Sequence, residues 1–204
     1  MTAPEPWPHV LLLHGLTGAG RGHWQSWLAH ELAQAGAEVD VPVFSDPDAP
    51  SLDTWLAELA HHLAANPRAA RRVVVAHSLG AALWLHHATR TPADDHSLRV
   101  DAVLLVAPPG AAWRHPDVHG FTPVPLDPAG IRRAAGWTQL VTGEDDPALP
   151  VDEAVTMAAT LKVDLDVIRS GGTLDPRTGY GPWPSLLDWV RDRHTRLAAR
   201  EPVG

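Results

Sequence analysis

The sequence predicts an α/β fold: a single doubly wound, mostly parallel sheet of about six strands with helices on both faces. Short apolar, β-branched runs alternate with amphipathic stretches along the chain, as expected of parallel strands joined by crossover helices. The 204 residues are enough to bury a large core, and such a length is typical of one α/β domain. No repeat, low-complexity tract or linker interrupts the pattern.

The predicted strands cover residues 9–14, 38–44, 72–77, 100–107, 138–142 and 163–168. The predicted helices lie near residues 24–35, 52–65, 80–90, 128–135, 152–161 and 184–196. Gly36 follows the first helix, Ser51 precedes the second, and Asn66-Pro67 ends it. We divide the chain into an N-terminal extension (1–8), an α/β domain (9–198) and a C-terminal tail (199–204).

The amino-acid composition argues against several classes of function. The formal net charge is −8, and the only lysine is Lys162. No basic stripe interleaves with aromatic residues, so we expect neither a nucleic-acid nor a membrane partner. The absence of cysteine excludes disulfides, thiolate catalysis and cysteine–zinc sites. The apolar run at 10–13 is too short for a signal or membrane span, so we expect a cytoplasmic protein. The oligomeric state is not predicted.

The segment at residues 73–82 is the most informative. Its β-branched run ends in Ala76-His77-Ser78-Leu79-Gly80 and passes into an Ala/Leu-rich helix. This is the pattern of a nucleophile elbow, a sharp strand–helix turn with small residues on both sides of an exposed serine. Ser78 is therefore the candidate nucleophile, and the Leu79 backbone N–H is a candidate oxyanion donor. The alternative is an ordinary strand–helix junction with a polar cap.

A glycine-rich loop, His14-Gly15-Leu16-Thr17-Gly18-Ala19-Gly20, follows the first predicted strand. Residues 15–20 have the spacing of a phosphate-binding loop, but Arg21 and Gly22 replace its lysine and Ser/Thr. The dinucleotide fingerprint fails as well, because His23 replaces its third glycine. We therefore expect no cofactor. The loop fits an oxyanion loop instead, with the Leu16 N–H as the second donor.

The candidate acid is Asp146, which lies directly after a late strand, as the chain order of serine, acid and histidine requires. Asp145 is a near rival and Glu144 a distant one. A solvated acidic turn that opens a helix is the alternative interpretation.

The connection at residues 108–127 is long and follows the carboxyl end of a strand, where open α/β sheets bind ligands. We therefore interpret it as a wall or lid of the binding site. Surface padding is the alternative. We expect a small-molecule pocket formed with His14, Trp24, Trp113 and Phe121. Although His115 and His119 have a metal-compatible spacing, Pro116 and Gly120 argue against a helix there, and no metal site is expected.

The expected histidine is missing. The loop after the last strand reads Ser170-Gly171-Gly172-Thr173-Leu174-Asp175-Pro176, and the next histidine, His194, falls far down the predicted terminal helix. His14, His23, His77, His115 and His119 are the candidate substitutes. We expect His14 to bond the loop backbone and the His77 side chain to point away from the pocket, and the sequence favours none of the five as the base.

The chain resembles the small serine hydrolases related to retinoblastoma-binding protein 9 and the bacterial YdeN type. The matching stretches are His14-Gly15, Gly22-His23-Trp24, the Trp55 helix, Ala76 to Gly80, Val106-Ala107-Pro108-Pro109, Phe121-Thr122-Pro123-Val124-Pro125, Asp146-Pro147 and Gly179-Tyr180-Gly181-Pro182-Trp183-Pro184. The resemblance implies a compact α/β-hydrolase fold without a large cap domain. It also implies that the final loop carries a general-base histidine at the position of Thr173.

The sequence thus predicts a serine hydrolase acting on a small, partly apolar ester, thioester or amide, impaired because threonine cannot take a proton from Ser78. Two alternatives remain open. One is a catalytically inactive binding protein that keeps the pocket, and the other is a lyase or cyclase that uses only the oxyanion hole.

Overall fold

Six parallel strands form one sheet in the order β2-β1-β3-β4-β5-β6, in a computed structural model that describes residues 6–65, 71–95 and 97–200. The strands are β1 (His9–Leu13), β2 (Val39–Asp40), β3 (Arg72–His77), β4 (Val100–Val106), β5 (Ala135–Gly143) and β6 (Asp164–Ile168). The helices are α1 (Trp24–Gln34), α2 (Leu52–Ala65), α3 (Leu79–Arg90), α4 (Pro128–Ala134), α5 (Val151–Leu161) and α6 (Pro184–Arg191), with a short 3-10 helix at Pro176–Thr178. The predicted fold class is confirmed.

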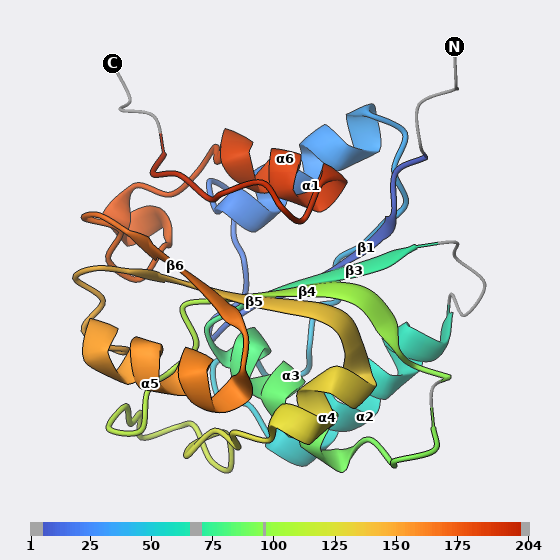
Figure 1. Cartoon of the computed structure of the whole chain (residues 1–204). Helices are drawn as coiled ribbons and strands as arrows, with labels where there is room; N and C mark the ends of the chain where they lie inside the picture. Colours follow the sequence, from blue (N-terminus) through green and yellow to red (C-terminus); the bar gives the residue numbers. More distant parts are fainter. Residues whose placement is uncertain (1–5, 66–70, 96, 201–204) are drawn as a thin grey trace.

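Helices cover both faces of the sheet: α1 and α6 lie on one face, and α2, α3, α4 and α5 on the other (Figure 1). The alternation along the strands explains the two layers. Val73 and Val75 of β3 belong to the core under α1 and α6, whereas Val74 and Ala76 belong to the core under the other four helices. Because successive side chains of a strand point to opposite faces, both apolar faces need a helical cover.

Two predicted elements are shorter in the structure. The strand expected at 38–44 pairs only at Val39–Asp40, because Pro42 has no N–H to donate and the chain leaves the sheet edge there. The helix expected to reach residue 196 ends at Arg191. Beyond it, Leu197 N–H donates to Asp166 Oδ2, so the chain runs back along the sheet edge. The prediction that His194 lies on the terminal helix is therefore wrong.

The topology produces a crevice where the direction of winding reverses. From β1 the chain moves outward to β2, and then returns across β1 to β3. The loops that leave the carboxyl ends of β1 and β3 therefore diverge, and ligands of open α/β sheets bind at such a point. These two loops carry Leu16 and Ser78. No helix within the described residues is long and apolar enough to span a membrane. Residues 1–5, the helix stop at 66–67 and residues 201–204 lie outside the described part.

Candidate active site

Ser78 occupies a strained position between β3 and α3. Its backbone angles are φ 52° and ψ −117°, a region that side-chain-bearing residues rarely adopt. Its own N–H donates to Val106 O at 2.9 Å, and its carbonyl oxygen accepts from Ala81 and Ala82 in the first turn of α3. The surrounding hydrogen bonds thus hold the serine in this conformation at the start of a helix.

Two glycines allow this turn to pack against the loop after β1. A Cβ on Gly80 would lie 2.5 Å from Leu13 O and 2.7 Å from His14 O, so α3 can approach β1 only without a side chain there. A Cβ on Gly15 would lie 2.8 Å from the Ser78 Cβ. Gly15 therefore lies close against the serine.

A cleft of about 660 Å³ opens above Ser78 at the carboxyl ends of the strands. Of the sequence-predicted site residues, it brings together Leu16, Ser78, Trp113, Asp146 and Thr173. Leu79, which follows Ser78 at the first position of α3, has a fully buried side chain. Four segments that are distant in sequence therefore meet around Ser78.

Three residues predicted to line the pocket do not line the cleft, and these predictions were wrong. The His14 ring is buried under the loop, where it contacts Gly15 O at 2.8 Å and accepts from Phe44 N at 3.0 Å. Trp24 is fully buried in the core under α1 and α6. Phe121 is fully buried on the other face, edge-on to Trp55 at a centroid distance of 5.3 Å. The position of an aromatic residue beside a loop in the sequence does not tell whether its ring faces the cleft or the core.

Asp146 is the buried carboxylate of the cleft, with 3% of its surface exposed. Its Oδ1 accepts from Ala148 N at 2.8 Å, whereas its Oδ2 is closed off from solvent and has no hydrogen-bond partner among the described residues. Burial raises the pKa of Asp146 to about 6, although backbone N–H groups partly oppose the shift. Asp145, the rival, uses its Oδ1 to accept from Gly172 N at 2.7 Å.

Side chains from α1, β3 and the loop after β5 hold the backbone of the final loop. Besides the bond from Gly172 N to Asp145, the indole N–H of Trp24 donates to Leu174 O at 2.8 Å. His77 Nε2 lies 3.1 Å from Thr173 O and can only donate to that carbonyl. Three consecutive residues of the loop are thus fixed through backbone atoms, so the position of the Thr173 Cα does not depend on its side chain.

The Thr173 hydroxyl donates to Asp175 Oδ2 at 2.8 Å and makes no hydrogen bond to Asp146 or Ser78 within the described part of the chain. Arg177 also donates to Asp175 Oδ2, from Nη2 at 2.6 Å. Burial raises the pKa of Asp175, but the hydrogen bonds from Arg177 and Thr173 outweigh it, and this pKa lies below its ordinary value. The sequence analysis missed both residues, and the structure shows Asp175 and Thr178 forming a capping box around the short 3-10 helix.

The histidines near Ser78 are neutral and bonded elsewhere. Both nitrogens of His14 are used by the backbone, and His23 Nδ1 accepts from Gln25 N at 3.1 Å. Burial lowers the pKa of His14, His77 and His23, that of His23 to about 3. His77 was expected to point away from the pocket; its side chain shares the sheet face of Val73 and Val75 and lies against Trp24, but it still forms part of the cleft wall. Within the described residues, no histidine nitrogen is hydrogen-bonded to the Ser78 hydroxyl.

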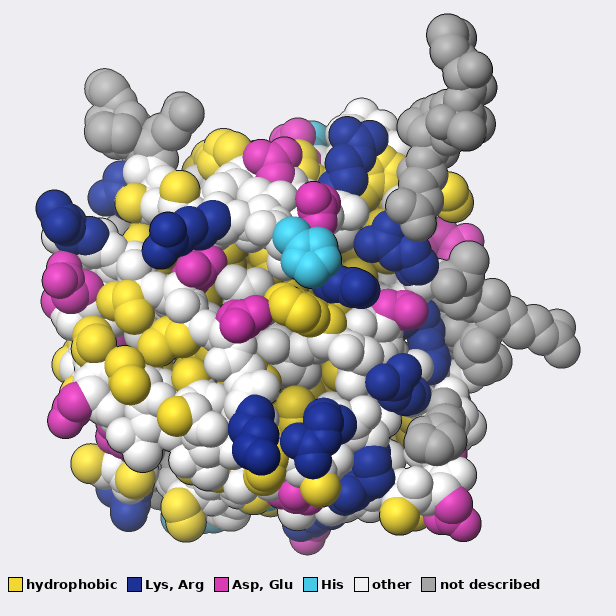
Figure 2. Space-filling view, viewed as in Figure 1, with side chains coloured by type: hydrophobic (Ala, Val, Ile, Leu, Met, Phe, Trp, Pro, Cys, Tyr) yellow, Lys and Arg dark blue, Asp and Glu magenta, His cyan; other side chains and the backbone are white. Residues whose placement is uncertain are grey.

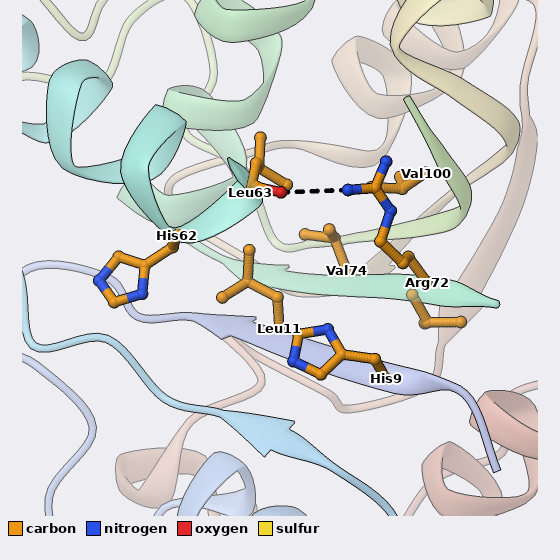
Figure 3. A pocket seen from close by; sticks show the side chains of 8 residues that line it. His9, Leu11, His62, Leu63, Arg72, Val74 and Val100 are labelled. Atoms are coloured by element: carbon orange, nitrogen blue, oxygen red, sulfur yellow. Dashed lines mark hydrogen bonds between the residues drawn. The ribbon is translucent and has the colours of Figure 1, made fainter. Parts of the chain in front are cut away.

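A second hollow, at the opposite end of the sheet, is too small for a ligand (Figure 3). Its volume is about 10 Å³, roughly the space of one water molecule. Arg72 fills the site by donating to Leu63 O at 3.1 Å. This hollow therefore does not rival the cleft above Ser78 as a place for a ligand.

Comparison with known proteins shows the family to which the chain belongs. The sequence profile of the family described as serine hydrolase matches residues 10–192. The chain belongs to the serine hydrolase family. Among curated proteins, none matches the sequence.

Solved structures of this family's fold are similar over most of the chain. The ydeN gene product from B. subtilis is 23% identical, with 89% of this chain and 95% of that chain covered at a TM-score of 0.74. A protein described as a YdeN-like hydrolase from Pectobacterium atrosepticum is 19% identical, with 90% and 89% covered at a TM-score of 0.70. A thioesterase domain from the curacin biosynthetic pathway is 16% identical, with 93% and 92% covered at a TM-score of 0.63. At these identities, the likeness establishes the α/β-hydrolase fold.

Proposed function

We propose that the protein is a serine hydrolase whose Ser78 forms an acyl-enzyme with a small, partly apolar ester, thioester or amide. The observation that carries this proposal is the backbone of Ser78, which has φ 52° at the apex of a strand–helix turn and lies in one cleft with Asp146 and Thr173. A nucleophile elbow requires this conformation, whereas an ordinary capped junction does not. The apolar Trp113 and Ala107 in the cleft wall favour a partly apolar substrate.

The backbone N–H groups of Leu16 and Leu79 are the proposed oxyanion hole. Neither N–H has a hydrogen-bond acceptor among the described residues, and Leu79 is the first residue of α3. The positive end of the helix dipole adds to the stabilisation of the oxyanion that develops on the substrate carbonyl. Asp146 is the proposed acid of the triad, because it is buried in the cleft with one oxygen unpaired, whereas Asp145 holds Gly172.

Thr173 is proposed to stand at the position of the general base, and this limits the turnover of the protein. A threonine hydroxyl does not accept a proton near neutrality, so Ser78 has no positioned base from this loop. Loss of the base of a serine triad costs on the order of a million-fold in turnover, with a remainder that comes from the oxyanion hole and binding. We therefore expect slow hydrolysis, and cytoplasmic activity on a small molecule.

Labelling with a fluorophosphonate serine probe tests the proposal. We expect slow labelling of the protein as it stands and a gain of about 10²-fold or more in Thr173→His, the range that a positioned base supplies. Ser78→Ala in the Thr173→His background is the control and should abolish labelling. Rapid labelling of the unchanged chain would show that another group activates Ser78.

A pocket that binds without hydrolysis is the second candidate function. The observation that favours it is that no histidine nitrogen is bonded to the Ser78 hydroxyl within the described residues. A non-catalytic binding protein or a lyase that uses only the oxyanion hole should remain unlabelled even with Thr173→His. That single outcome separates these candidates from a hydrolase with a replaced base.

A further inference from the structure

A third hollow, on the surface beside α4, is lined almost entirely by arginines. It is shallow, open to solvent and about 630 Å³ in volume, and its lining residues are Arg99, Ala129, Arg132 and Arg133. Arg132 and Arg133 belong to the last turn of α4, which leads directly into β5, and Arg99 directly precedes β4. The hollow therefore lies at the amino ends of these strands, whereas the cleft above Ser78 lies at the carboxyl ends.

Two of the three guanidinium groups are held in place by bonds to the surrounding backbone. Arg99 Nη2 donates to Ala135 O at 3.3 Å, and Arg133 Nε donates to Thr91 O at 3.1 Å. The helix that carries Arg133 is fixed as well, because a Cβ on Gly130 would lie 2.6 Å from a backbone oxygen of α3. A guanidinium has more N–H donors than these bonds use, so both groups keep donors that can serve a ligand.

The positive charge of the hollow is only partly compensated. Arg133 Nη2 lies 3.4 Å from Asp127 Oδ2, whereas Arg99 and Arg132 form no ion pair within the described residues. No carboxylate of that part of the chain lines the hollow, and the nearby Asp101 accepts from the backbone of β3 instead. Basic side chains gather in the lower central and right part of the face in Figure 2, where Figure 1 places α4 in the same view. Because the whole chain has a net charge of −8, this excess of positive charge is local.

We propose that the hollow binds a small molecule through a phosphate group, held by the guanidinium groups of Arg99, Arg132 and Arg133. Arginine binds phosphate oxygens through parallel N–H bonds, and its planar group suits this geometry better than an ammonium does. A phosphate monoester carries a charge of about −1.5 to −2 near neutral pH and three strong acceptor oxygens. It therefore matches two uncompensated arginines and a third that is already paired, whereas a carboxylate offers less charge and fewer oxygens. The volume of the hollow is in the range of small-molecule sites, so an organic group can accompany the phosphate.

Arg132 is the residue through which the site can be tested without disturbing the fold. It is exposed, and it makes no hydrogen bond or ion pair within the described residues, whereas Arg99 and Arg133 also hold backbone oxygens. The site is also independent of the proposed hydrolysis, because the residues that line the hollow differ from those that line the cleft. Failure of either proposal therefore leaves the other intact.

Isothermal titration calorimetry of the full chain with inorganic phosphate, at pH 7.5 and constant ionic strength, measures the binding. We expect saturable binding with a dissociation constant of about 1 mM or tighter. Arg132→Gln should weaken it about tenfold, the effect of losing a hydrogen bond between charged groups. Arg169→Gln is the matched control, because it removes the same charge from an exposed arginine that does not line the hollow. Its effect should stay below about twofold, since salt screens distant charges.

Arg132→Lys and two further probes sharpen the result. The lysine variant keeps the charge without the planar fork and should recover only part of the affinity. Glycerol 2-phosphate distinguishes the two sources of the group: tighter binding than inorganic phosphate identifies an organic phosphate as the ligand, and weaker binding identifies free phosphate. Acetate should bind at least about tenfold more weakly than phosphate. The absence of saturable binding, equal losses in Arg132→Gln and Arg169→Gln, or equal affinities for acetate and phosphate would each overturn the inference.

Discussion

The indole N–H of Trp24 donates to the carbonyl oxygen of Leu174 at 2.8 Å, which joins residues 150 positions apart in the sequence. Trp24 is the first residue of α1, and the loop that precedes it leaves β1 beside Ser78. Leu174 follows Thr173 in the loop after β6. The two loops at the cleft are therefore tied to one rigid element, so their relative positions are set by the fold before any ligand arrives.

Asp146→Asn should stabilise the protein at neutral pH. The folded pKa of Asp146 is about 6, above its ordinary value of 3.8, so the folded state holds this proton more tightly than the unfolded state does. Burial of the ionised carboxylate lowers the unfolding free energy. This loss is absent below pH 3.8, where the carboxyl is protonated in both states, and is fully present above pH 6. Asparagine does not titrate and can still accept from Ala148. The gain in unfolding free energy should therefore grow from pH 4 to pH 7 by on the order of 3 kcal/mol, measured by urea denaturation.

Ser78→Gly should raise stability relative to Ser78→Ala, although both remove the hydroxyl. Only glycine adopts φ 52° and ψ −117° without strain. Strain of this kind costs about 1–3 kcal/mol, and the greater freedom of glycine in the unfolded chain offsets part of the gain. We expect Ser78→Gly to be more stable by about 1 kcal/mol in thermal or urea unfolding. Equal stability of the two variants would show that the turn is relaxed.

Gly80→Ala should be strongly destabilising. Its Cβ would meet two backbone oxygens, of Leu13 and His14, at 2.5 and 2.7 Å, and neither atom belongs to a flexible side chain. We expect a loss of about 3 kcal/mol or more, at the upper end of the range for overpacking. Gly20→Ala is the control, because nothing lies within 4 Å of its Cβ. Comparable losses for the two variants would contradict the close approach of α3 to β1.

His23→Asn should make the protein less sensitive to acid. Burial lowers the pKa of His23 to about 3 from its ordinary 6.5, so its stabilising contribution is complete above pH 6.5 and is lost as the pH falls toward 3. Asparagine keeps the acceptor for Gln25 N at the start of α1. The drop in unfolding free energy between pH 7.5 and pH 5 should shrink by about 2 kcal/mol. An unchanged drop would show that His23 does not contribute to it.

Most of the fold could be predicted from the sequence because apolar periodicity and glycine and proline signals are local. The strand at 72–77 and the helix at 52–65 have the predicted bounds. The predictions failed where tertiary contacts decide the end of an element. The bond from Leu197 N to Asp166 draws the chain out of a helix that the local sequence would allow to continue.

The residues of the cleft that could be predicted are those that directly follow the ends of strands. Ser78, Leu16, Trp113, Asp146 and Thr173 all follow strands, and a parallel sheet brings such positions to one edge. Their catalytic roles stay predictions. Asp175 and Arg177 were missed because their importance comes from contact with Thr173. His14, Trp24 and Phe121 were misplaced because an aromatic ring beside a loop fits the core as well as a pocket.

Acidic and basic side chains both occur over the face of the molecule shown in Figure 2, and several basic ones gather in its lower central and right part. The final loop is held through Gly172 N, Thr173 O and Leu174 O, and the side chain of residue 173 takes part in none of these bonds. Evolution can therefore exchange that side chain with little effect on folding. A substitution at residue 173 can thus change the lining of the cleft while the loop that carries it keeps its place.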